Sequence, residues 1–138
     1  MLRTLIGIFL IAHGLVHSGL AAAPIPNDPA SKPGAFFTAA ARSWLLTGMR
    51  LNASVIRNVG LGLVGLATLS FLLAGLGVLG IPGLHAIWRG LTLLSAGLSL
   101  VLLVVFWHPW LLIGVALDLG MLASILWAHW PTSNIIGA

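Results

Sequence analysis

Four apolar stretches, each about as long as a membrane is thick, constrain this chain more than any other feature. A helix of about 20 apolar residues crosses roughly 30 Å of hydrocarbon. The sequence therefore predicts an all-α fold, an integral membrane four-helix bundle that forms a single membrane domain over residues 1–138. The expected spans are 5–23, 55–79, 88–107 and 110–130.

The charge content supports this class of protein. Only 6% of the residues are charged, against about 25% in a soluble domain. Membrane lipids are therefore the expected solvent. The net charge of +4 does not indicate nucleic acid as a partner, because the basic residues form no run and most of them lie in or beside one loop. The chain has no cysteine, which excludes disulfides and thiolate metal sites.

A proline-rich segment separates the first two spans. Residues 24–33 hold four prolines, which oppose helix formation there. Residues 35–51 are compatible with a helix and mix aromatic residues with Arg42 and Arg50. This pattern predicts a short interfacial helix lying on the membrane between the first and second spans. A loop with a few apolar anchors is the alternative.

Tryptophans mark the span boundaries. Indole rings prefer the headgroup level of a membrane, so we expect these side chains to be interfacial anchors. Between the last two spans, His108 and Pro109 leave almost no loop, which predicts a tight antiparallel hairpin. Four spans place both chain termini on one side of the membrane. The expected anchors are Trp44, Trp88, Trp107, Trp110, Trp127 and Trp130.

The first span carries a stripe of small residues. Gly7, Gly14 and Ser18 recur at helical spacing on one face. Small residues let membrane helices approach closely. We therefore expect another helix to pack against this face.

Asp118 lies near the middle of the fourth span, where a carboxylate costs about 2.5–3.5 kcal/mol. A rise of about 1.5 Å per residue places His13, Ser99 and Asp118 at one depth, with Ser95 nearby. We expect Asp118 to face the interior and to bond His13, with Ser95 or Ser99 next. Two interpretations stay open: a proton-carrying or ligand-binding cluster, or a structural pair that holds the helices in register.

His13 and His17 are four residues apart and could present two imidazoles to one ligand. Neither a cysteine nor a second histidine pair accompanies them, so the identity of any metal stays open. A bis-histidine haem is disfavoured, because the depths of the candidate histidines do not match. The main expectation is no cofactor, with a single axial histidine for a haem or chlorophyll-type pigment as an alternative.

Several short motifs together resemble a group of small uncharacterised bacterial four-helix membrane proteins. These are the residues 13–17 (HGLVH), 43–46 (SWLL) and 106–110 (FWHPW), then Asp118 and the Trp130-Pro131 pair. The resemblance implies a bacterial inner-membrane location and brings no activity. In layout the chain is also loosely similar to DoxX-type membrane proteins.

Three functional hypotheses follow. The first is a non-catalytic accessory or structural subunit of a larger respiratory or photosynthetic membrane complex, packed against other subunits or its own copies. The second is a small proton-coupled transporter that uses Asp118 and His13. The third is a single-histidine haem or pigment protein. The sequence holds no hydrolase elbow, phosphate loop or carboxylate pair, so we do not expect an enzyme.

Overall fold

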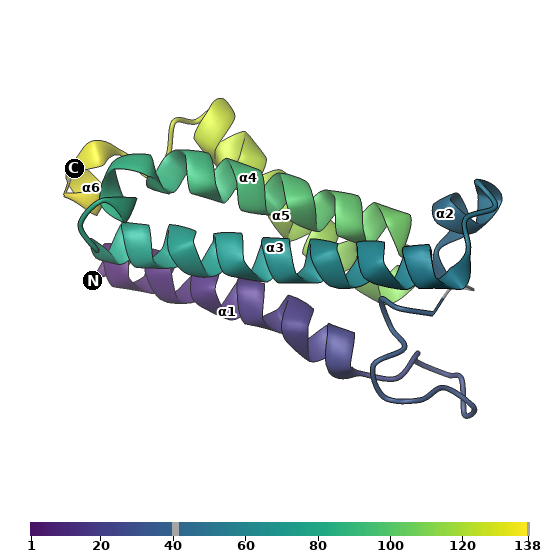
Figure 1. Cartoon of the computed structure of the whole chain (residues 1–138). Coiled ribbons are helices and arrows are strands. Elements are labelled where there is room, and N and C mark those ends of the chain that lie inside the picture. Colours follow the sequence, from purple (N-terminus) through teal and green to yellow (C-terminus); the bar gives the residue numbers. More distant parts are fainter. Residues whose placement is uncertain (40–41, 138) are drawn as a thin grey trace.

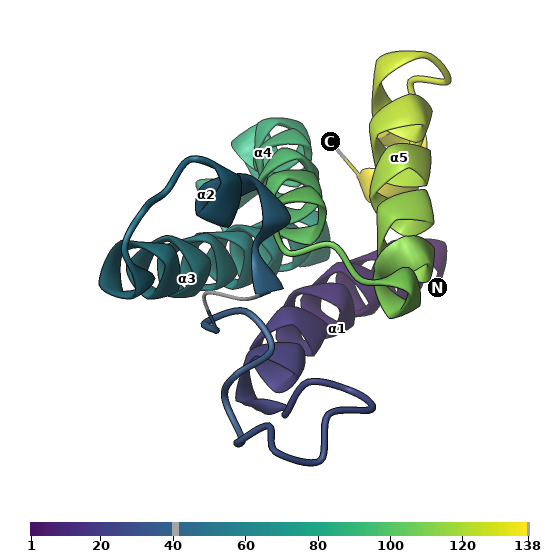
Figure 2. The same cartoon turned by 90° about the vertical axis from the view of Figure 1, so that its right-hand side faces the viewer.

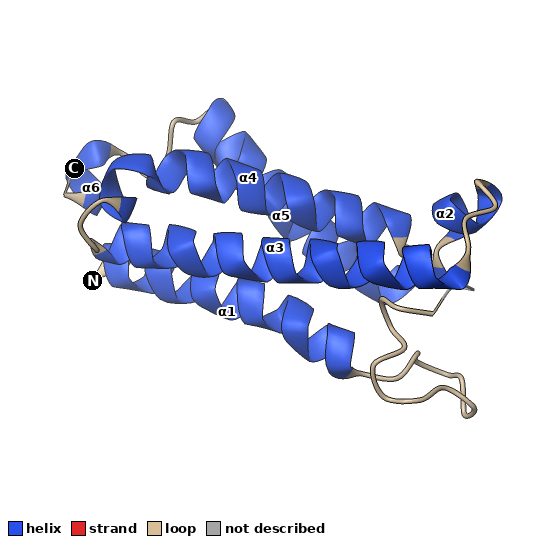
Figure 3. Ribbon diagram, viewed as in Figure 1, coloured by secondary structure: helices blue, strands red, loops and turns tan. Residues whose placement is uncertain are grey.

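Helices make up most of the protein in the computed structural model, which describes residues 1–39 and 42–137 (Figures 1 and 3). The regions 2–22, 53–79, 84–105 and 109–126 are long and apolar enough to cross a membrane. This confirms the predicted fold class. The elements are α1 (Leu2–Ala22), α2 (Trp44–Gly48), α3 (Ala53–Leu79), α4 (Leu84–Val105), the 3-10 helix η2 (Pro109–Leu111), α5 (Leu112–Leu126) and α6 (Ser133–Ile136).

The four long helices form a bundle in which α3 and α5 lie on opposite sides, with α1 and α4 between them (Figure 2). Helix α3 packs along both α1 and α4, and α5 packs against α4. The two termini lie at the same end, as four spans predict (Figure 1). We call this end the termini end, and the opposite end, which carries the proline-rich segment, the loop end.

Glycines bring α1 and α3 into close contact. A Cβ atom on Gly7 would lie 3.1 Å from the carbonyl oxygen of Gly75, and one on Gly14 would lie 2.6 Å from Cβ of Phe71. Ser18 continues this face with a hydrogen bond of 3.0 Å to the hydroxyl of Thr68. The predicted close packing along this stripe is confirmed, and it fixes the face of α1 that lies next to α3.

Two helices end earlier than predicted. Helix α4 stops at Val105, because His108 takes the extended backbone (φ −150°, ψ 144°) that a residue before proline favours. Helix α5 stops at Leu126 instead of Trp130. Beyond it, the Trp130 amide turns back to the carbonyl oxygen of Ser124, and His129 takes a positive φ of 48°.

The predicted interfacial helix is much shorter than the helix-compatible segment. Of the described residues in 35–51, only Trp44–Gly48 are α-helical. Phe36 and Phe37 are buried, and they pack with Phe106 at the loop end. These two side chains fill the end of the bundle instead of lying on its surface, so the segment before α2 follows turns that bring them inward.

The tryptophan prediction is wrong for Trp88. Its side chain is only 5% exposed and packs inside the bundle. Because α4 begins at Leu84, four residues earlier than expected, Trp88 lies one turn inside the helix instead of at its end. The other five tryptophans are at least 41% exposed and can reach a headgroup layer.

Candidate functional site

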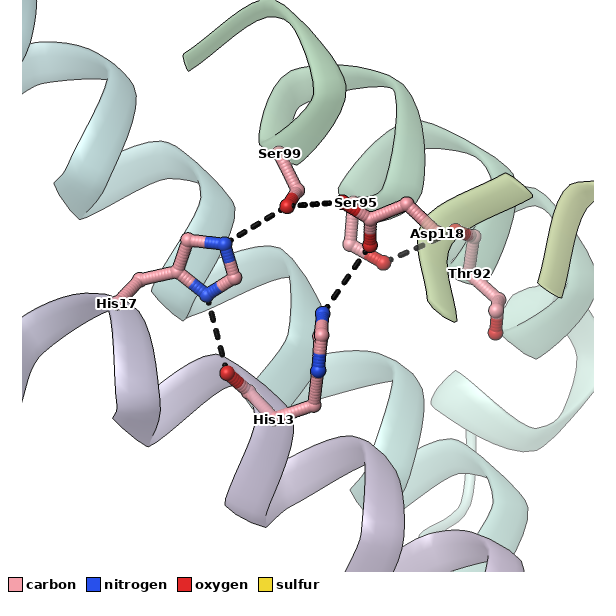
Figure 4. A network of polar contacts seen from close by, with 6 residues as sticks. All are labelled: His13, His17, Thr92, Ser95, Ser99 and Asp118. Atoms are coloured by element: carbon pink, nitrogen blue, oxygen red, sulfur yellow. Dashed lines mark hydrogen bonds and ion pairs between the residues drawn. The ribbon is translucent and has the colours of Figure 1, made fainter. Parts of the chain in front are cut away.

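Four polar side chains meet in the middle of the bundle (Figure 4). Helix α1 contributes His13 and His17, α4 contributes Ser99, and α5 contributes Asp118. All four are buried. We call these residues the central cluster.

Asp118 is the centre of this cluster and is fully buried. Its Oδ1 lies 3.1 Å from Nε2 of His13, and its Oδ2 is hydrogen-bonded to the hydroxyl of Ser99. The predicted inward orientation and the His13 contact are therefore present in the structure. On the opposite face of α5, the small residues Ala116 and Gly120 are exposed.

His17 belongs to the cluster, although the sequence indicated it only as a ligand candidate. Its Nε2 lies 2.7 Å from the Ser99 hydroxyl, and its Nδ1 lies 3.0 Å from the carbonyl oxygen of His13. The depth argument from the sequence grouped His13, Ser95, Ser99 and Asp118 and did not include His17. The four-residue spacing of the two histidines was the available signal, because it puts both imidazoles on one face of α1.

Ser95, predicted as a further member, does not bond the carboxyl group. Its hydroxyl donates to the carbonyl oxygen of Thr92, and the Thr92 hydroxyl donates to the carbonyl oxygen of Trp88. Both hydroxyls thus donate their hydrogen bonds to backbone carbonyl oxygens of their own helix. Ser95 lies one turn from Ser99 and is equally buried, which makes it a matched comparison for the role of Ser99.

Aromatic rings enclose the two imidazoles. The Phe71 ring of α3 lies 4.8 Å from the His13 ring and 5.8 Å from the His17 ring, measured between centroids. Phe9 stacks on His13 from the termini side at 5.9 Å. On the side that faces α3, the cluster is therefore covered by an aromatic ring that has no ionisable group.

Two cavities flank the cluster along the seam between α1 and α5. One, of about 340 Å³, lies toward the termini end, and the other, of about 330 Å³, lies toward the loop end. The first is lined mainly by apolar side chains, including Leu5, Phe9, Met121, Ile125 and Trp130. The second is lined by both histidines together with apolar side chains that include Leu20, Trp110 and Leu117. The loop-end cavity therefore reaches the central cluster at its two histidines.

The donor geometry bears on the cofactor alternatives. Within residues 1–39 and 42–137, no three histidine or acidic side chains are grouped so that they could hold a metal ion. Both ring nitrogens of His17, and Nε2 of His13, already take part in hydrogen bonds. A haem or pigment ligated through His17, or through Nε2 of His13, would have to take a nitrogen out of these bonds.

Comparison with protein families, with curated proteins and with solved structures finds no match to this chain. The functional argument therefore rests on the geometry of the central cluster and its two cavities.

Proposed function

We propose that this protein is a small proton-coupled transport protein that uses Asp118 and His13. One observation carries the proposal: a fully buried carboxyl group in the middle of four membrane-length helices, bonded by side chains from two other helices. Ionisable groups inside a membrane are costly, and they typically mark ion pathways and proton relays. Asp118 and His13 are such groups, and they are held within hydrogen-bonding distance.

The cavities on either side of the cluster support this role. A transport protein needs space that leads to its ion-binding group from both sides of the membrane. On the loop-end side, His13 and His17 line such a space, and on the termini-end side an apolar cavity begins next to Phe9, which stacks on His13. A change in the protonation of Asp118 would alter the strength of its bond to His13 on α1.

The setting of the protein is also part of the proposal. The resemblance noted for the sequence supports the bacterial inner membrane as its location. A four-span chain is short for a carrier, so we propose that copies of the chain associate. In this role the protein is not an enzyme. The accessory-subunit hypothesis rests on small size and the lack of an aqueous domain, and co-purification of other subunits is its test.

Reconstitution into lipid vesicles tests the proposed function. Proton uptake driven by an imposed membrane potential is measured for the unmodified protein and for Asp118→Asn. We expect Asp118→Asn to lower uptake to the level of empty vesicles, because an amide cannot exchange a proton at this position. Asp28→Asn is the matched control, since Asp28 is exposed in the proline-rich segment and bonds only locally. Equal uptake in all three proteins would overturn the proposal.

A further inference from the structure

The contacts of His17 determine where its protons lie. Nδ1 of His17 is 3.0 Å from the carbonyl oxygen of His13. A carbonyl oxygen only accepts hydrogen bonds, so Nδ1 carries a hydrogen. The charge of His17 is therefore decided at Nε2, the nitrogen that faces the Ser99 hydroxyl at 2.7 Å.

Ser99 has one hydroxyl hydrogen and two partners, Nε2 of His17 and Oδ2 of Asp118. If Ser99 donates to Asp118, then Nε2 of His17 must donate to Ser99, and the cluster holds an imidazolium and a carboxylate. If Ser99 donates to His17, then the Asp118 carboxyl must carry a hydrogen and donate it to Ser99, and both groups are neutral.

His13 fits both arrangements in the same way. Its Nε2–H donates to Oδ1 of Asp118 in each of them. A third neutral arrangement, with the extra proton on His13, leaves Ser99 between two acceptors with one hydrogen, so one bond is lost. Without net charge, two proton arrangements satisfy all the contacts of the cluster. Net charge is disfavoured in hydrocarbon, so these two arrangements are the relevant ones.

We infer that Ser99 is a proton shuttle and that His17 is a second proton-binding group of the cluster. In the transfer, the Oδ2–H bond of Asp118 breaks and its proton moves to Oγ of Ser99. The former hydroxyl proton of Ser99 moves at the same time to Nε2 of His17. One proton leaves the carboxyl group, one arrives at the imidazole, and Ser99 is regenerated. The reverse transfer restores the first arrangement.

This inference deepens the proposed transport function, and its biological role rests on that function. His17 lies one turn beyond His13, about 6 Å further along α1, on the loop-end side. It lines the loop-end cavity, whereas Asp118 is fully buried and lines neither of the two cavities. The shuttle therefore moves a proton from the middle of the seam to a group at the loop-end cavity, without an ionisable group from α3 taking part.

Nuclear magnetic resonance on the full chain in lipid, with labelled histidine and aspartate, tests the inference. It measures the fraction of His17 protonated at both nitrogens and the fraction of Asp118 that is ionised, from neutral to alkaline pH. The shuttle predicts that the two fractions are equal in the unmodified protein. Ionised Asp118 together with neutral His17 in the same population would overturn it.

Substitutions at the shuttle position complete the test. We expect the fraction of doubly protonated His17 and the fraction of ionised Asp118 to differ in Ser99→Ala. In Ser99→Thr, which keeps a hydroxyl, we expect the two fractions to be equal. Ser95→Ala should leave this equality unchanged, because that hydroxyl bonds its own helix. Equality that survives in Ser99→Ala would overturn the shuttle. Vesicle uptake is a separate readout: equal fractions without any proton uptake would contradict the transport function and leave the shuttle standing.

Discussion

The middle of the bundle and its loop end both hold hydrogen-bonded polar side chains, but for different reasons. At the loop end, Ser43 donates to the carbonyl oxygen of Val105, Trp44 to that of Val104, and Arg42 to that of Phe106. These carbonyls belong to the last residues of α4 and to Phe106, which caps it, where no further helical amide is present to bond them. The loop-end side chains therefore complete the hydrogen bonding of the backbone.

The central cluster does not complete the hydrogen bonding of the backbone in this way. His13, His17, Ser99 and Asp118 lie within continuous helices, and Asp118 is bonded by side chains. Apolar side chains in these places would leave the helix backbone bonds intact. The comparison teaches that burial and hydrogen bonding alone do not separate structural from functional polar groups. The difference is whether a polar side chain bonds a backbone group that would otherwise lack a hydrogen-bond partner.

The largest effect on stability should come from removing Asp118 alone. Asp118→Ala leaves His13 and Ser99 buried without their shared partner, and we expect the free energy of unfolding to fall by about 3 kcal/mol. Replacing all four members together, with His13→Leu, His17→Leu, Ser99→Ala and Asp118→Leu, should keep stability within about 1 kcal/mol of the unmodified protein. Unfolding in mixed detergent micelles measures both.

If the free energy of unfolding of the fourfold variant fell by several kcal/mol, the contrast between the central cluster and the loop end would be wrong. That result would mean that the fold depends on the central cluster as it depends on the loop-end contacts.

Gly60 gives the next largest effect, at the loop end. A Cβ atom there would lie 1.8 Å from the carbonyl oxygen of Phe37, so Gly60→Ala must displace the buried segment. We expect a loss of about 1–3 kcal/mol in the free energy of unfolding, typical of overpacking. Gly62→Ala is the control, because no atom lies within 4 Å of its added Cβ. Equal stability of the two variants would show that the Phe37 segment does not pack as described.

Ser43 should give a smaller loss. Its hydroxyl donates to the carbonyl oxygen of Val105 and accepts from the amide of Leu46 at the start of α2. Ser43→Ala leaves both backbone groups without this partner, which should cost about 1–2 kcal/mol in the same unfolding measurement. Ser54→Ala, at an exposed hydroxyl, should cost much less. Proton uptake by Ser43→Ala in vesicles should match that of the unmodified protein, since Ser43 lies outside the central cluster and does not line either flanking cavity.

The smallest effect is a pH dependence at the loop end. Burial and the nearby Arg42 hold the pKa of His108 below its usual value. The unfolded chain then binds the proton more readily, so stability should fall as pH falls through about 6.5. Protonation also removes the acceptor that Nδ1 offers to the Trp110 amide. Unfolding midpoints at neutral and mildly acidic pH should differ more in the unmodified protein than in His108→Gln. An identical pH dependence in both would contradict this.

The sequence predicted the His13–Asp118 contact because the rise of a helix is constant and residue counting gives depth in the membrane. It did not predict the His17–Ser99 contact, which depends on how far an imidazole reaches across two particular helices. The interfacial helix was overestimated for a related reason. Phe36 and Phe37 are apolar whether they face lipid or fill the end of a bundle, and only their packing against Phe106 decides between the two.

Proton uptake by vesicles that contain the fourfold apolar variant tests the central claim most directly. This variant lacks every ionisable group and the hydroxyl of the central cluster, and it keeps the loop-end contacts of α4. If the cluster carries protons and the loop end only supports the fold, the variant inserts and unfolds like the unmodified protein but takes up no protons. Uptake equal to that of the unmodified protein would show that protons do not pass through the central cluster.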